Sequence, residues 1–138
     1  MDFRLEVTGA VKNTLRLSMD DLREQYAPCS VDVQFQNNDG TVNATFVGAR
    51  LWDILQAAEI STETPDKLRV MARASDKFRC LLRWNEVDPA VSERVILVAY
   101  EQDGKPFASK EGALRLVVPG DKQGRRKLRG LARITVLD

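Results

Sequence analysis

The end of the chain carries the residues best suited to chemistry. The strand-like run Ala113-Leu-Arg-Leu-Val-Val-Pro-Gly120 closes on Pro-Gly, and the segment 121–129 after it contains one glycine among many Lys and Arg residues. Ammonium and guanidinium groups in such a loop suit an anion, and a phosphate or pyrophosphate is the natural candidate. The candidate anion-binding residues are therefore Arg115, Lys122, Arg125, Arg126 and Arg129.

The charge distribution supports an anionic ligand near the C-terminal part. Residues 1–104 hold 12 basic and 17 acidic residues, a balance of −5, whereas residues 105–138 hold 9 basic and 3 acidic residues, a balance of +6. The alternative interpretation is a solvated connection between strands with no ligand. Nucleic acid is an unfavoured partner, because the basic run is short and has no interleaved aromatic residues.

Several conventional chemistries are excluded by composition. The chain has no His and only two Cys, Cys29 and Cys80. Nucleophile pairs of the Ser-His or Cys-His type cannot form, and no zinc cluster or disulfide framework is encoded. We predict no metal ligand and no catalytic residue, while Lys-based or carboxylate-based chemistry stays open. Cys80 shares its alternation with Phe78, Leu82 and Trp84, and we expect its thiol to point into the core.

The elements that must position these residues are mostly strands. Period-two alternation predicts strands near 3–8, 14–17, 30–36, 41–46, 67–74, 78–84, 95–101, 113–118 and 131–137. Helices are predicted at 19–25, after the N-cap candidate Ser18, at 50–58, and as a short turn near 85–91. Turns are predicted at Asn37–Gly40 and Asp103-Gly104. The length of 138 residues suits one domain, 1–138, of mostly-β α+β class.

Some residues have two interpretations. Arg115 stands between Leu114 and Leu116, so its side chain either lines an outer sheet face or serves a ligand. Tyr100 is expected to pack in the core with its polar tip outward, Asp53 to complement a helix dipole, and Asp76 to form a turn. Phe35, Phe46 and Trp52 are expected to form one core patch. Because alternation begins at Phe3, we expect no signal peptide in the chain as it stands, and we expect a cytoplasmic compartment, or a periplasmic one if a leader was removed.

The order of several phrases resembles a known family. The phrases are Val7-Thr-Gly9, Leu17-Ser-Met-Asp-Asp-Leu22, Phe46-Val-Gly-Ala-Arg-Leu-Trp-Asp-Ile-Leu55, Ala74-Ser-Asp-Lys-Phe78, Val98–Pro106 and Gly112–Gly120. Together they resemble the molybdopterin-binding domain of the sulfite oxidase family, and more closely its small single-domain bacterial members. The resemblance covers nearly the whole chain and implies a mixed α+β fold with a largely β core.

The resemblance also implies a cofactor site with two ends. Family enzymes bind molybdenum through a phosphate-bearing pterin, and a Cys thiolate ligates the metal at a position that here corresponds to Phe35, close to Asn37. At the phosphate end, Arg115 takes the place of a pterin-binding Arg, Arg129 that of a Lys, and Lys110 that of a His. The cofactor-binding candidates are therefore Phe35, Asn37, Lys110, Lys122, Arg115, Arg125, Arg126 and Arg129.

Two functions follow from this pattern. The first is a molybdopterin-binding oxidoreductase domain, in which the cofactor would supply the redox chemistry. The second is a non-catalytic module that holds a small anion, a pterin phosphate or a partner protein in the same fold. The missing thiolate at Phe35 favours the second, because a fold does not fix a function.

Overall fold

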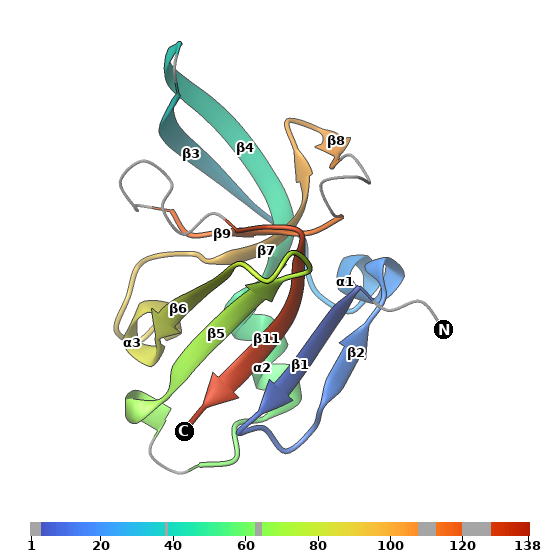
Figure 1. Ribbon diagram of the computed structural model, residues 1–138, viewed down its shortest axis with the longest axis vertical. Helices are drawn as coiled ribbons and strands as arrows, with labels where there is room; N and C mark the ends of the chain where they lie inside the picture. The colour runs from blue at the N-terminus through green and yellow to red at the C-terminus, as the bar shows by residue number, and fades with distance from the viewer. Residues whose placement is uncertain (1–3, 38, 63–64, 108–112, 120–127) are drawn as a thin grey trace.

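The computed structural model describes residues 4–37, 39–62, 65–107, 113–119 and 128–138 of the chain (Figure 1). The strands are β1 (Leu5–Gly9), β2 (Leu15–Leu17), β3 (Cys29–Asn37), β4 (Gly40–Arg50), β5 (Arg69–Ala74), β6 (Arg79–Arg83), β7 (Leu97–Gln102), β8 (Lys105–Pro106), β9 (Arg115–Val117), β10 (Leu128–Arg129) and β11 (Leu131–Leu137). The helices are α1 (Met19–Glu24), α2 (Leu51–Ala58), the 3-10 helix η1 (Pro65–Lys67) and α3 (Trp84–Val87). The predicted mostly-β α+β fold is confirmed.

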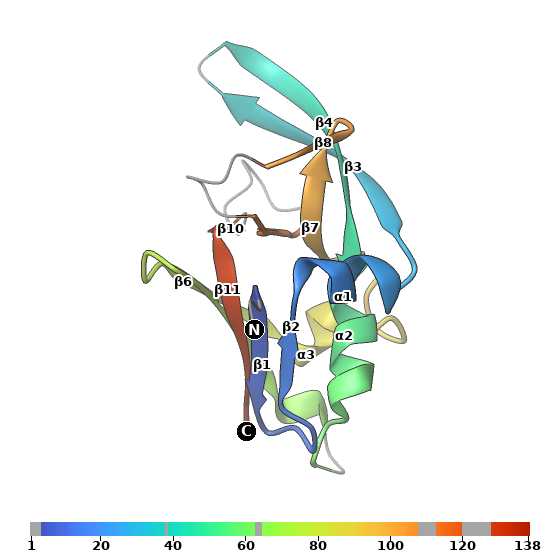
Figure 2. The ribbon, with the colours of Figure 1, turned by 90° about the vertical axis from the view of Figure 1, so that its right-hand side faces the viewer.

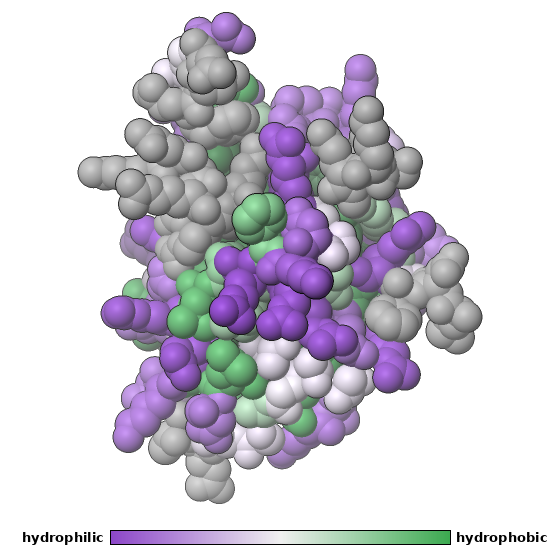
Figure 3. Space-filling model, in the orientation of Figure 1, coloured by the Kyte–Doolittle hydropathy of each residue, from purple (hydrophilic) through white to green (hydrophobic). Residues whose placement is uncertain are grey.

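The first sheet has the strand order β2-β1-β11-β5-β6. The β1–β11 pair is parallel and the other neighbours are antiparallel. One face of this sheet packs against the side of the molecule that carries α2 and α3 (Figure 2). The α2 residues at the predicted spacing, Leu51, Ile54, Leu55 and Ala58, are all buried, so the predicted inward stripe is confirmed. The opposite face of the sheet is turned to solvent (Figure 3).

The second sheet has the order β10-β9-β7-β4-β3, and β8 pairs with β7 beside β9. Strands β3 and β4 form a long hairpin that projects from the rest of the molecule (Figure 1). Its turn lies where the sequence predicted it, since Asn37 pairs with Gly40, and Gly40 has a φ of 115°. Among the described residues, no helix is long and apolar enough to cross a membrane.

Most element boundaries agree with the predictions, and the start of α1 agrees in detail. The Ser18 hydroxyl accepts a hydrogen bond from the Asp21 amide, and the Asp21 carboxylate accepts one from the Ser18 amide, which completes a capping box. Strand β4 continues to Arg50, beyond the predicted 41–46. The two-residue strands β8 and β10 were not predicted, because so short a segment carries no periodicity.

Two predictions about the core are wrong. Phe46 and Trp52 do not share one patch: Phe46 belongs to a small cluster in the second sheet, while Trp52 packs against the main core and against the Trp84 ring of α3, at a centroid distance of 5.4 Å. Phe78 does not follow Cys80 inward, because it precedes β6 in a turn and is 71% exposed. The side chain of Phe35 lies outside the described residues, so its expected place in the patch is untested.

Strands β4 and β7 approach each other closely at Gly48. A Cβ atom at this position would lie 2.1 Å from the Val98 carbonyl oxygen and 2.5 Å from the Ala99 Cα. The pairing register also shifts between Val47 and Gly48. Because only a residue without a Cβ fits there, Gly48 fixes how β4 joins the central strand of the second sheet.

We expect Gly48→Ala to lower the free energy of unfolding by at least about 2 kcal/mol, because the methyl group meets backbone atoms that cannot rotate away. Chemical denaturation measures the change. The matched control is Thr41→Ala, an exposed change in the same strand, which should stay within about 0.5 kcal/mol of the parent. Equal stability of the two variants would show that β4 and β7 are not held together at this point.

Candidate anion-binding site around Arg115

Arg115 occupies an interior position of the second sheet. It begins β9, where Ala99 of β7 is its partner on one side and Arg129 of β10 on the other. Its side chain is only 5% exposed, and among the described residues it is the one charged side chain that is buried. Its neighbours Leu114 and Leu116 are buried as well, because β9 is covered on both faces. The outer-face interpretation of Arg115 is therefore wrong.

The Arg115 guanidinium is held by an amide and an aromatic ring. Its Nη1 donates a hydrogen bond of 3.0 Å to Oε1 of Gln102. Its Cζ lies 4.2 Å from the centroid of the Phe107 ring, and that ring in turn contacts Phe46 at a centroid distance of 6.4 Å. A guanidinium stacked on an aromatic face in a desolvated position gains a cation–π attraction and loses rotational freedom. Arg115 is thus fixed in one orientation.

The turn after β7 brings Phe107 to this position. Asp103 and Gly104 have φ angles of 53° and 84°, the left-handed values that a tight hairpin needs at both central residues. The chain then returns along the edge of β7 that β9 also uses, with Pro106 opposite Glu101 and Arg115 opposite Ala99. Phe107 consequently follows β8 toward the start of β9.

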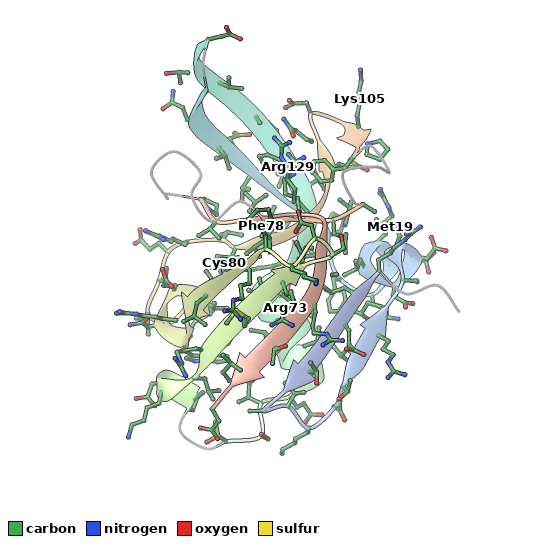
Figure 4. All side chains as sticks on the ribbon, in the orientation of Figure 1. Met19, Arg73, Phe78, Cys80, Lys105 and Arg129 are labelled. Carbon is green, nitrogen blue, oxygen red and sulfur yellow. The ribbon has the colours of Figure 1, made fainter. Side chains whose placement is uncertain are left out.

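Arg129 completes a pair of arginines on neighbouring strands. It lies directly opposite Arg115 in the β9–β10 register, and its side chain is exposed (Figure 4). Side chains directly opposite one another in an antiparallel pair have Cβ atoms about 4.5–5.5 Å apart, and like charges there destabilise the pair. Two guanidinium groups on neighbouring strands are also able to donate hydrogen bonds to one oxyanion. The structure therefore brings together two of the residues that the sequence indicated.

The described backbone does not bring Phe35 and Asn37 to this pair. Phe35 and Asn37 lie near the tip of the β3–β4 hairpin, opposite Val42 and Gly40. The β4–β7 pairing ends at Phe46, so Phe35 lies about four residues, or roughly 13 Å, beyond it along the hairpin. Lys110, Lys122, Arg125 and Arg126 lie outside the described residues.

The two cysteines do not form a metal site. Cys29 begins β3 opposite Gly48, whereas Cys80 lies on β6 of the other sheet, opposite the buried Ala72. Cys29 is six residues from Phe35 on the same strand, a distance of about 20 Å, against a metal–sulfur bond of about 2.3 Å. In the part of the chain that the structure describes, no three His, Cys, Asp or Glu side chains gather as metal ligands.

Cys80 itself lies as the sequence predicted. Its side chain is partly buried and packs against the main core, which fits a small hydrophobic side chain at a sheet edge.

The surroundings of Tyr100 indicate a role in packing. It is buried, the Arg23 guanidinium carbon lies 4.2 Å from its ring centroid, and burial raises the pKa of the phenol above its ordinary value. A phenol with a raised pKa stays protonated at neutral pH, so it is unsuited to act as a base. Asp53 lies in the first turn of α2, and Asp76 accepts a hydrogen bond from the Phe78 amide, both as predicted.

Sequence reasoning did not find Gln102 and Phe107 as the partners of Arg115. The signal for Phe107 was present in the Asp103-Gly104 turn, since a tight hairpin there returns the next residues along β7. Gln102 carried no signal of its own, because its role depends on the register between β7 and β9.

Comparisons with known proteins identify the family. The whole chain, residues 1–138, matches the family described as "Oxidoreductase molybdopterin binding domain", and the chain belongs to this family. Among 29 matching chains of solved structures is the sulfane dehydrogenase SoxCD from Paracoccus pantotrophus, with a TM-score of 0.79 and 19% sequence identity. The alignment covers 99% of this chain and 38% of that chain, so this chain spans well under half of its length. No curated protein matches.

We expect a double-mutant cycle of Arg115→Met and Phe107→Leu to give a coupling energy of about 0.5–2 kcal/mol, because the ring contacts a desolvated guanidinium. Thermal or denaturant unfolding of the parent and the three variants measures it. The comparison pair is Arg23 and Tyr100, which has the same 4.2 Å separation, but Arg23 is partly exposed and also paired with Glu101. The Arg23–Tyr100 coupling should be smaller, and the reverse order would contradict the assigned environment of Arg115.

Proposed function

We propose that this chain is an anion-binding module of the molybdopterin-binding oxidoreductase domain family, without redox catalysis at a cysteine-ligated metal. The observation that carries the proposal is the direct pairing of Arg115 with Arg129, together with the fixed orientation of the Arg115 guanidinium. Such a pair can be bridged by one oxyanion, and guanidinium groups bind phosphate with parallel hydrogen bonds.

The residues present fit only one end of the family's cofactor. A phosphate group suits the Arg115–Arg129 pair. A thiolate-ligated metal does not fit, because Phe35 stands at the expected thiolate position and both sulfur atoms lie elsewhere in the fold. The pterin with its phosphate is one ligand of the right chemistry, and a free phosphate or pyrophosphate is another.

The chain's own residues have distinct parts in this binding. Gln102 and Phe107 position Arg115, which acts as the buried, preoriented donor. Arg129, which is exposed, contributes the second charge and the route to solvent. Lys122, Arg125 and Arg126 belong to the segment that joins β9 to β10, and Lys110 to the one that precedes β9, so connectivity supports adding them to the proposed site. Phe35 and Asn37 lie near the tip of the β3–β4 hairpin, and we include them in the proposed binding site only as residues distant from the arginine pair.

Ligand-dependent thermal stability tests the proposal. Pyrophosphate at saturating concentration should raise the Tm of the parent protein by about 5 °C, since a ligand that binds only the folded state stabilises it. The rise should be absent in Arg129→Gln, a substitution at an exposed position. Lys105→Gln, an exposed change on β8, is the matched control and should keep the full rise. Sodium chloride at the same ionic strength separates a bound anion from general screening.

The metal content of the purified protein distinguishes a molybdenum-containing oxidoreductase domain from a non-catalytic anion-binding module. Protein produced in a host that makes the molybdenum cofactor should contain far less than one molybdenum atom per chain. Bound pterin without metal would identify the cofactor's phosphate end as the anion, and bound phosphate alone would identify a free anion. Stoichiometric molybdenum would overturn the non-catalytic assignment, and an equal response to pyrophosphate in Arg129→Gln would overturn the site.

A further inference from the structure

The solvent-facing side of the first sheet carries a dense field of arginines. Alternation places Leu5, Val7, Val70, Ile134 and Val136 in the core, so the residues between them face outward. In the described strands the outward residues are Arg16, Glu6, Thr8, Arg133, Thr135, Leu137, Arg69, Met71, Arg73, Arg79, Leu81 and Arg83. We call this set the arginine face. It holds six Arg, one Glu and no Lys.

The register of the sheet aligns these residues in rows. One charged row crosses all the strands, in the order Arg16, Glu6, Arg133, Arg73, Arg79. The next row is uncharged: Thr8, Thr135, Met71, Leu81. A third row holds Leu137, Arg69 and Arg83. Figure 3 looks onto this face and shows hydrophilic residues at its centre, where Figure 4 labels Arg73.

The charges on the arginine face are only partly balanced. Glu6 binds Arg16 at 3.2 Å and Arg133 at 3.0 Å, so the only carboxylate of the face is already shared by two arginines. Arg73 lies between Arg133 and Arg79, directly opposite both, and Arg69 lies directly opposite Arg83. Each like-charged pair of this kind destabilises a sheet by several tenths of a kcal/mol. A face with this repulsion is suited to meet negative charge.

The kind of residue indicates the class of partner. Arg and Met are enriched at protein interfaces and Lys is depleted, which matches a face whose basic residues are all Arg and whose middle row contains Met71 and Leu81. Phe78, 71% exposed at the turn into β6, adds an apolar contact at the margin. A single-stranded nucleic acid would instead need several aromatic residues on the sheet surface for stacking, whereas the described strands of the arginine face have none and Phe78 lies only at its margin.

We propose that the arginine face docks an acidic protein surface: carboxylates opposite the rows of Arg73, Arg79, Arg69 and Arg83, and apolar side chains over Met71 and Leu81. The residues of the arginine face belong to the first sheet, whereas Arg115 and Arg129 belong to the second. Docking at the arginine face gives the chain a second binding function that does not require the family's cofactor.

Binding of a synthetic peptide, EELEELEE, to the whole chain tests the docking surface. The parent should bind this peptide at low salt, and the affinity should fall as salt is raised toward physiological strength. The double variant Arg73→Glu/Arg79→Glu should weaken binding at least about tenfold. Lys105→Glu, the same charge reversal at an exposed position of the other sheet, should leave it unchanged. The peptide KKLKKLKK should not bind.

Measurements of variant stability and of binding to other ligands distinguish docking at the arginine face from unfolding and from non-specific attraction. Arg73→Glu alone should raise the Tm by about 2–4 °C, because it replaces one of three neighbouring positive charges with a negative one. Binding is also measured in Arg73→Gln/Arg79→Gln, which removes the charges without reversing them. The proposal is overturned if the double variants bind the peptide as well as the parent does. It is equally overturned if the parent binds single-stranded DNA or phosphatidylserine vesicles more tightly than the acidic peptide, or binds none of them.

Discussion

A guanidinium group inside a sheet must be held by other side chains, and the second sheet is organised around this requirement. Arg115 is buried between β7 and β10, so its charge and its donors cannot be left to bulk water. The Asp103-Gly104 turn returns the chain along β7 and delivers Phe107 to one side of the guanidinium, while Gln102 accepts a hydrogen bond from Nη1. The close approach of β4 at Gly48 fixes the other edge of β7. The orientation of Arg115 therefore depends on both the position of β8 and the register of β9.

The proposed anion site and Phe35 lie on different parts of the second sheet. The Arg115–Arg129 pair belongs to β9 and β10, whereas Phe35 lies on the projecting β3–β4 hairpin. Because different strands carry them, the proposed anion site does not depend on the residue at position 35. The arginine face lies on the other sheet.

The sequence predicted the fold where a local pattern and the tertiary environment agree. The α2 stripe, the Ser18 N-cap and the hairpin at Asn37–Gly40 depend on residues close together in the chain, and all were confirmed. The burial of Arg115 was not predicted, because alternation assigns faces but does not say whether both faces of a short strand are covered. The charged row of the arginine face was not predicted either. Its members become neighbours only through strand register: Arg16, Arg73, Arg79 and Arg133. The net charge along the chain does not indicate this row, because acidic residues of other surfaces lie between its members in the sequence.

The most direct test of the central claim is the NMR signal of the arginine side chains during titration with pyrophosphate. The Nε–H resonances of Arg115 and Arg129 should shift together with one dissociation constant, while that of Arg94, which is paired with Glu86, should stay in place. That result would place one anion between the two strands. Shifts spread evenly over the exposed arginines, with no change at Arg115, would contradict the account.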